Sequence, residues 1–216
     1  LSLRRQRQMC IRDSDKTVLA LAKKTSNKRF AKDSYRRFIQ MYSNVVLGVE
    51  HDRFEAVLAN KKRLDNVASD ADFNVDQLEW IINAYKNTVE RFTNAEFPQD
   101  PYEQLMGSIE AVFNSWQNKR ATTYRKINNI PDEWGTGATI QTMVFGNLND
   151  KSGTGVAFTR NPSNGLKELY GEYLINAQGE DVVAGIRTPH PIREDKNIEQ
   201  ESLESKFPNV YRDILE

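Results

Sequence analysis

The sequence predicts an α+β protein, a helical subdomain over residues 15–130 followed by a mainly antiparallel β-rich portion over residues 131–192. In the first part, apolar residues recur at spacings of three and four, as on one face of a helix. In the second part, three runs rich in branched and aromatic residues are bounded by Gly, Asn, Asp or Pro, as strands are. The helical spacing stops at residues 130–135, where we place the boundary.

Residues 1–14 do not fit the rest and are predicted to be a non-native leader. They carry four arginines against one aspartate, and no apolar stretch of a targeting signal follows them. The stretch resembles translated sequencing-adapter read-through at the end of a gene fragment. The fold prediction therefore starts at residue 15.

The helical part is predicted to contain several amphipathic helices. The first apolar stripe ends before Gly48, and a polar linker is expected over residues 61–72. Asn74 has the spacing of a capping box with the residue three positions later, and Asp100 is placed to cap the helix after it. The expected core residues are Tyr35, Phe38, Ile39, Tyr42, Val45, Val46, Leu78, Ile81, Ile82, Tyr85, Val89, Phe92, Leu105, Ile109, Val112, Phe113 and Trp116.

The β-rich part is predicted to hold strands over residues 139–145, 155–160 and 168–175. Their short connections favour antiparallel neighbours. A charged tail over residues 193–216 follows, in which an amphipathic helix is expected to begin near Leu203.

Three groups in the β-rich part have the chemistry to bind a nucleotide. Ser152, Gly153, Thr154 and Gly155 form a Gly-rich stretch whose outward N–H groups and hydroxyls suit a phosphate, although a hairpin turn without a ligand explains the same residues. The strand that carries Gln141, Met143 and Val144 offers backbone groups and a thioether to an adenine. Glu180 and Asp181 are expected on a turn before a strand at residues 182–183, where they suit ribose or magnesium, or simply cap the turn.

The balanced composition excludes other kinds of partner. The chain has 216 residues, 28% of them charged, and a formal net charge of zero, so nothing attracts it to nucleic acid or to acidic lipid. No run approaches the ~20 apolar residues of a membrane span. The single cysteine, Cys10, excludes an internal disulfide and a multi-cysteine metal site. We expect no nucleic-acid or membrane partner and a cytoplasmic location.

Several long segments resemble the pyruvate, phosphate dikinase family. They are Q-T-M-V-F-G-N at residues 141–147, S-G-T-G-V-A-F-T-R-N-P at 152–162 and G-E-Y-L-I-N-A-Q-G-E-D-V-V-A-G-I-R-T-P at 171–189. Upstream, R-F-A-K-D-S-Y-R-R-F-I-Q-M-Y and F-P-Q-D-P-Y-E-Q-L are similar to the same family, in the same order. The resemblance implies a piece of the N-terminal, ATP-grasp-type nucleotide-binding domain, truncated at both ends.

The resemblance assigns roles to individual residues. It implies that the stretch 152–155 binds the ATP phosphates, that Gln141, Met143 and Val144 bind adenine, and that Glu180 and Asp181 lie on the ribose or magnesium side. Arg160 and Arg187 lie in matched motifs, where they either contact phosphate or form structural salt bridges. The residues implied in docking the mobile phosphohistidine domain, unless they are ordinary solvated groups, are Arg37, Arg120, Ser163 and Glu172.

The parent enzyme implied by the resemblance converts ATP, pyruvate and phosphate to AMP, phosphoenolpyruvate and diphosphate through a phosphohistidine in another domain. Its pyruvate-binding barrel, its phosphohistidine domain and its second subunit in a homodimer are the expected partners. A lysine and an arginine of the ATP site, and the main Mg²⁺ ligands, match nothing in this chain, so we expect the chain alone to be inactive. The alternatives are a phosphoenolpyruvate synthase-like enzyme and a non-catalytic nucleotide-binding or docking module.

Overall fold

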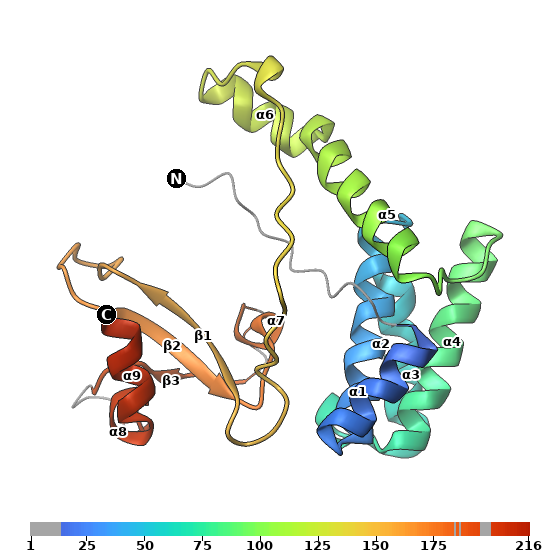
Figure 1. Cartoon of the computed structure of the whole chain (residues 1–216), viewed down its shortest axis with the longest axis horizontal. Coiled ribbons are helices and arrows are strands. Elements are labelled where there is room, and N and C mark those ends of the chain that lie inside the picture. Colours follow the sequence, from blue (N-terminus) through green and yellow to red (C-terminus); the bar gives the residue numbers. More distant parts are fainter. Residues whose placement is uncertain (1–13, 184, 186, 195–199) are drawn as a thin grey trace. The chain divides into compact units, whose positions relative to one another are not determined.

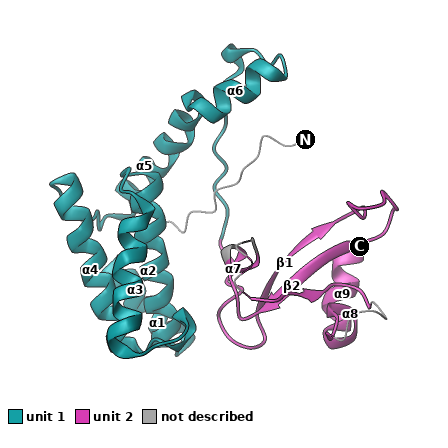
Figure 2. Cartoon of the chain, turned by 180° about the vertical axis from the view of Figure 1, so that it is seen from behind, with its two compact units in different colours: residues 1–142 teal, residues 143–216 magenta. Residues whose placement is uncertain are grey.

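The computed structural model describes residues 14–183, 185, 187–194 and 200–216. The chain divides into two compact units, residues 1–142 and residues 143–216 (Figure 2). The first unit is helical and the second carries a three-stranded antiparallel sheet, so the predicted α+β class is confirmed. The predicted leader lies outside the described residues except for Ser14, whose side chain accepts a hydrogen bond from the N–H of Thr17 and caps the first helix.

Four helices of the first unit pack into a bundle (Figure 1). They are α1 (Asp15–Thr25), α2 (Lys28–Val45), α3 (His51–Asp65) and α4 (Val75–Thr93). The apolar stripes predicted for α2 and α4 pack against each other, and Tyr35, Phe38 and Ile39 are at most 1% exposed. The core prediction is wrong for Phe92, which is 48% exposed near the end of α4. Aromatic rings from α2 meet Phe97 edge to face, with centroids 5.6–6.5 Å apart. The bundle therefore has a continuous core of its own.

The predicted helix boundaries are correct where a capping residue sets them. Asn74 and Gln77 form the predicted capping box at the start of α4, each accepting the backbone N–H of the other at 2.9 Å. The Asp100 carboxylate accepts two N–H groups at the start of α5 (Pro101–Asn114), also as predicted. The polar linker expected over residues 61–72 is wrong, because α3 continues to Asp65 and a Lys61–Asp65 ion pair of 2.9 Å stabilises its last turn. A 3-10 turn, η1 (Asp70–Asp72), precedes α4.

The helical arm after the bundle differs from the prediction. It consists of α5, η2 (Ser115–Gln117), α6 (Lys119–Ile127) and η3 (Asp132–Trp134), and Figure 1 shows α5 and α6 leading away from the bundle. Gly107 of α5 approaches Tyr42 of α2 so closely that an added Cβ would lie 2.7 Å from the Tyr42 hydroxyl. Beyond this contact the stripe expected in the core is only half-buried, and Phe113 is 50% exposed. The core prediction for α5 is therefore wrong.

The second unit is built on β1 (Gly153–Phe158), β2 (Tyr170–Ile175) and β3 (His190–Pro191), which pair antiparallel in that order. One face of the sheet is covered by α8 (Leu203–Lys206) and α9 (Pro208–Leu215), whose Leu203, Phe207 and Tyr211 pack with Tyr173 and Ile192. The helix expected near Leu203 is thus present. A short helix, α7 (Gly179–Val183), follows β2.

Two strand predictions are wrong. Residues 139–145 form no strand and do not belong to the sheet of the described chain. Residues 182–183 belong to α7 instead of a strand. No helix of the described residues combines the length and the apolar character needed to cross a membrane.

Candidate nucleotide-binding site

The Gly-rich stretch expected to form a phosphate loop lies mostly inside a strand. Gly153 pairs with Ile175, and Gly155 pairs with Tyr173, so these glycines are residues of β1 and not a hairpin tip. Neither has a positive φ. The glycine at 155 is instead required by close packing, because an added Cβ would lie 2.7 Å from the Glu172 carbonyl oxygen. The tight turn that the sequence suggested lies earlier, at residues 146–151.

The register nevertheless turns backbone N–H groups of these glycines outward. The N–H of Asn176 donates to the Ser152 carbonyl oxygen at 2.8 Å, which makes 152 and 176 a hydrogen-bonded pair. Because such pairs alternate in an antiparallel ladder, Gly153 and Gly155 direct their N–H groups to the side of β1 away from β2. No other strand of the described part pairs with β1 on that side. This edge offers donors spaced two residues apart to a phosphate.

The side chain of Thr154 is engaged within the fold. Its hydroxyl donates to the carbonyl oxygen of Ala177 at 2.8 Å, so its hydrogen serves an internal bond and not a ligand. The Ser152 hydroxyl lies 3.4 Å from Asn149 at the end of the preceding turn. Of the two predicted hydroxyl donors, Ser152 therefore makes the longer internal hydrogen bond.

The residues expected at the adenine lie on the extended segment before the sheet. Val144 is 89% exposed and Met143 is 37% exposed. Gln141 precedes them and is exposed as well. The side chains of Met143 and Val144 thus form an exposed apolar surface. Two residues after Val144, the Gly146 carbonyl oxygen accepts a hydrogen bond of 3.0 Å from the Ala177 N–H, which fixes the end of this segment.

The predicted acidic pair lies on α7. The carboxylate of Asp181 accepts the N–H of Gln178 at 2.8 Å, which is the capping role considered from sequence. Glu180 follows Gly179 in the same helix, and its side chain lies outside the described part of the structure. Among the described residues, no three His, Cys, Asp or Glu side chains gather as metal ligands do.

Both predicted phosphate-contacting arginines donate to backbone carbonyls. Arg187 reaches the oxygens of Ile175 and Asn176 at 3.1 and 3.2 Å, and thereby ties the chain after α7 to the end of β2. Arg160 donates to the Gly165 oxygen at 3.2 Å and closes the loop between β1 and β2. Both side chains thus hold loops in place through carbonyl oxygens, and their contact with phosphate stays a prediction.

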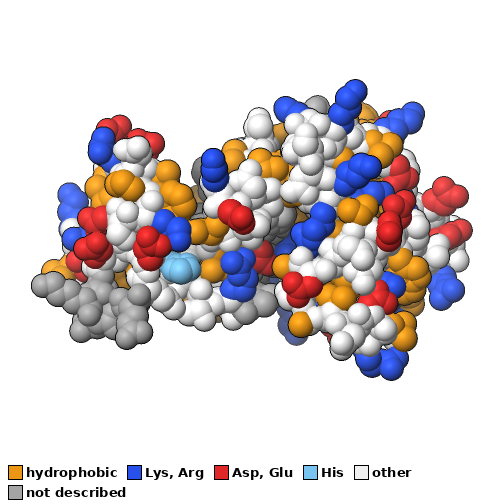
Figure 3. All heavy atoms as spheres, turned by 90° about the horizontal axis from the view of Figure 1, so that it is seen from below, with side chains coloured by type: hydrophobic (Ala, Val, Ile, Leu, Met, Phe, Trp, Pro, Cys, Tyr) orange, Lys and Arg blue, Asp and Glu red, His pale blue; other side chains and the backbone are white. Residues whose placement is uncertain are grey.

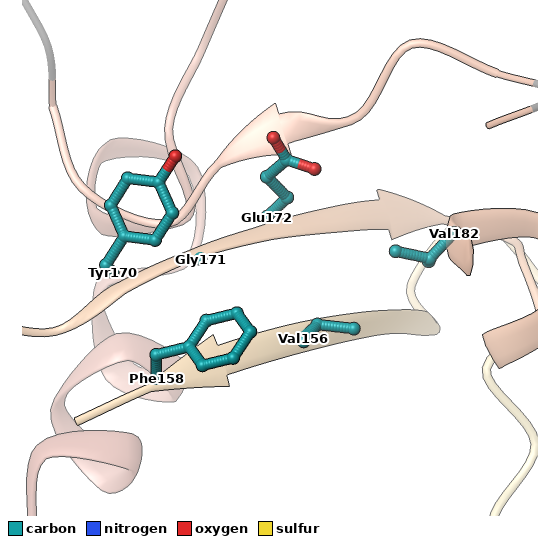
Figure 4. A pocket seen from close by; sticks show the side chains of 6 residues that line it. All are labelled: Val156, Phe158, Tyr170, Gly171, Glu172 and Val182. Atoms are coloured by element: carbon teal, nitrogen blue, oxygen red, sulfur yellow. The ribbon is translucent and has the colours of Figure 1, made fainter. Parts of the chain in front are cut away.

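The four predicted docking residues lie in different settings. Arg120 on α6 and Ser163 in the β1–β2 loop are exposed. Glu172 lines an apolar hollow of about 250 Å³ on the open face of the sheet, between Phe158, Tyr170 and Val182 (Figure 4). Arg37 is mostly covered, with its side chain 18% exposed, and forms an ion pair of 3.3 Å with Asp33. On the face drawn in Figure 3 basic and acidic side chains intermingle.

A buried ionic network in the bundle was not found by sequence reasoning. Arg36 is 2% exposed and bonds Asp33 at 2.9 Å and Gln40 at 3.3 Å. Burial alone would raise the pKa of Asp33, but the neighbouring Arg36 and Arg37 guanidinium groups outweigh it and lower the pKa below its usual value. Burial raises the pKa of Tyr85, whose hydroxyl meets Gln40, to about 12. The signal in the sequence is an aspartate with arginines three and four residues later, in the pattern Asp-Ser-Tyr-Arg-Arg, a spacing at which opposite charges pair on a helix.

A second unforeseen arginine fixes the end of the helical arm. Arg125 is 1% exposed, stacks 4.0 Å over the Trp116 ring and bonds Asp132 at 2.6 Å. The Trp116 ring N–H in turn donates to the Asp132 carbonyl oxygen at 3.1 Å. These contacts join η2, α6 and η3 and so fix where the chain leaves the arm toward residue 135.

Comparisons with known proteins identify the class of this fold. A family model described as the AMP/ATP-binding domain of pyruvate phosphate dikinase matches residues 97–214, which include β1, β2 and α7. The matched region is therefore a nucleotide-binding domain by family.

Relatives match over nearly the whole chain. Pyruvate, phosphate dikinase of Clostridium symbiosum is 52% identical over 204 residues, or 94% of this chain and 22% of that protein. The Rhizobium meliloti enzyme is 52% identical over 207 residues, or 93% of this chain and 23% of that protein. Pyruvate, phosphate dikinase 1 of Arabidopsis thaliana is 47% identical over 203 residues, or 94% of this chain and 20% of that protein. The chain belongs to the pyruvate, phosphate dikinase family, and it spans about a fifth of the length of these relatives.

Proposed function

We propose that this chain is the ATP-binding portion of a pyruvate, phosphate dikinase. The observation that carries the proposal is the family match over residues 97–214, which covers every segment on which we place a nucleotide contact. In the parent enzyme ATP would phosphorylate a histidine of another domain, inorganic phosphate would take up the terminal phosphoryl group, and the histidine would pass its phosphoryl group to pyruvate. The parent is then a phosphotransferase that makes AMP, phosphoenolpyruvate and diphosphate.

In this proposal the two ends of ATP contact different segments. The adenine packs against Met143 and Val144, beside Gln141, where the exposed apolar surface suits a flat ring. The phosphates lie along the outer edge of β1, against the N–H groups of Gly153 and Gly155 and the hydroxyl of Ser152. Glu180 and Asp181 are assigned to the ribose or magnesium side of the nucleotide. Phosphoryl transfer demands positioning and charge neutralisation above all, and backbone donors at an edge supply both.

Other parts of the parent complete the proposed site. We place the site in a domain of the ATP-grasp type, with the main Mg²⁺ ligands on other parts of the parent. Mg²⁺ would neutralise the phosphate charge there. We further place the parent in the cytoplasm as a homodimer, with Arg37, Arg120, Ser163 and Glu172 facing the phosphohistidine domain. The exposure of three of these four residues supports this placement.

A substitution at Val144 tests the proposal in the full-length dikinase. Val144→Lys places a charge where the adenine would pack, and because the residue is 89% exposed, the fold is expected to tolerate it. The KM for ATP should rise by about tenfold or more, which corresponds to ~1.4 kcal/mol of lost contact. Phosphoryl transfer between phosphoenolpyruvate and the histidine should not change.

The matched control is Val210→Lys, the same change at a valine that is 48% exposed on α9. It should leave both half-reactions unaltered. An unchanged KM for ATP in Val144→Lys would mean that the adenine binds elsewhere, and an equal loss in both half-reactions would mean that Val144 supports the fold.

A further inference from the structure

Three segments of the second unit meet at one point, which we call the Gly146–Thr154–Ala177 junction after its members. The Thr154 hydroxyl donates to the Ala177 carbonyl oxygen at 2.8 Å, and the Ala177 N–H donates to the Gly146 carbonyl oxygen at 3.0 Å. Ala177 is completely buried. Each polar group of the Ala177 backbone is therefore satisfied by a different segment, one by β1 and one by the turn before it.

Gly146 fits this junction only because it has no side chain. A Cβ at this position would collide with the Thr154 hydroxyl and the Ala177 carbonyl oxygen, and would lie 2.8 Å from the Gly153 carbonyl oxygen. Two of these three obstacles are backbone atoms, which do not move aside as the end of a flexible side chain does. The backbone of the turn is thus pressed directly against β1 and against the chain that leaves β2.

The junction lies between all three segments of the proposed nucleotide site. Met143 and Val144 come two to three residues before Gly146, and Gly153 and Gly155 flank Thr154 on β1. The chain after Ala177 enters α7, which carries the acidic pair, and the Asp181 carboxylate caps that helix on the N–H of Gln178. A shift at the junction would move the adenine segment relative to the phosphate edge.

We propose that Thr154 and Gly146 are positioning residues that set the distance between the adenine-binding segment and the phosphate-binding edge of β1. The inference rests on the proposed function and changes the role of Thr154, from a phosphate donor to the group that holds these segments together. A ligand that touches only one segment does not depend on that distance. A ligand that spans both, as ATP does, depends on it fully.

The test compares three ligands on the full-length dikinase, namely ATP, adenosine and inorganic diphosphate. Thr154→Val keeps the shape of the side chain and removes the hydroxyl, which leaves a buried carbonyl without its donor. The dissociation constant for ATP should rise about tenfold, or ~1.4 kcal/mol, whereas those for adenosine and for diphosphate should stay unchanged. Thr154→Ser restores the hydroxyl and should restore the affinity for ATP.

Thr123→Val is a matched control, because the Thr123 hydroxyl also donates to a backbone carbonyl, that of Lys119 at 2.7 Å, but on the exposed side of α6. It should not alter the binding of any of the three ligands. The rate of phosphoryl transfer from phosphoenolpyruvate to the histidine shows whether the other domains of each variant are folded. If Thr154→Val does not accumulate as folded protein, Thr154→Cys, which keeps the volume with a weak donor, must show the same selective loss for ATP.

Three results would overturn the inference. Unchanged binding of ATP to Thr154→Val would mean that the junction does not set the distance. Equal losses for all three ligands would mean that the junction only supports the fold. If the unsubstituted enzyme binds none of the three ligands, the proposed function is wrong and the inference fails with it. This result differs from the other two because the unsubstituted enzyme then has no measurable affinity with which the variants could be compared.

Discussion

The helical bundle and the sheet-bearing unit are stabilised in different ways. In the bundle, α2 and α4 bury a continuous set of aromatic and aliphatic side chains, and every helix end discussed above has a local cap. In the second unit, the buried apolar cluster is small, and backbone hydrogen bonds and close glycine contacts hold the segments. The first unit is therefore stabilised mainly by the packing of buried side chains. The second unit depends more on backbone hydrogen bonds and on close contacts of its glycines.

The largest expected effect tests the bundle core. Phe38 is 1% exposed and contacts the rings of Tyr42 and Phe97, so Phe38→Ala should lower the free energy of unfolding by ~3–5 kcal/mol. Phe158→Ala, the same change at a residue that is 47% exposed on the sheet, should cost ~0.5 kcal/mol or less. Urea unfolding of the 216-residue chain measures both, and equal costs would show that the contrast between the units is wrong.

A second prediction concerns the buried ions of α2. Asp33→Asn removes the charge that compensates Arg36 and should cost about 3 kcal/mol at pH 7. Because the pKa of Asp33 is lower in the folded than in the unfolded chain, its contribution is present above pH ~4 and is lost as the pH falls through the folded pKa. The difference in unfolding free energy between the unsubstituted chain and Asp33→Asn should become smaller as the pH falls from 5 to 2, because the Asp33 carboxylate is then protonated and loses its attraction to Arg36. A constant gap would contradict the lowered pKa.

The smallest effect is expected for the proposed docking residues. Glu172→Lys and Arg120→Glu reverse exposed charges, so each should slow ATP-dependent phosphorylation of the histidine by about tenfold or less, as rim charges do. Both should leave unfolding unchanged, whereas Arg37→Glu should also destabilise the bundle through its ion pair with Asp33. Rapid-quench measurements of both half-reactions provide the comparison. Normal ATP-side rates in both exposed variants would place docking on other residues.

Sequence reasoning was correct where local rules decide the structure. The stripes of α2 and α4 and the caps at Asn74 and Asp100 follow from residues within one or two turns. The strand expected over residues 139–145 was wrong because a strand needs a partner, and partners are not encoded in the strand itself. The stripe of α5 was read correctly as apolar, but its spacing does not say what covers it.

The nucleotide contacts of the candidate site stay predictions, but the local structure of its residues can be compared with the expectation. The Gly-rich stretch was singled out correctly as unusual, but its glycines serve a close strand contact at Gly155, which no pattern distinguishes from a turn. The junction at Ala177 left no signal, because alanine and glycine in a coil are common. Sequence reasoning did not single out Arg36 or Arg125, because partners such as Asp70 and Trp116 become visible only in three dimensions.

The open edge of β1 also has a consequence for handling the protein. β1 is the last strand on its side of the sheet in the described chain, and such an edge is a template for intermolecular strand addition. Lys151 and Arg160 lie just beyond the two ends of β1, where like charges on neighbouring copies repel. That protection weakens as salt screens it, so self-association of the 216-residue chain should increase with ionic strength and with concentration.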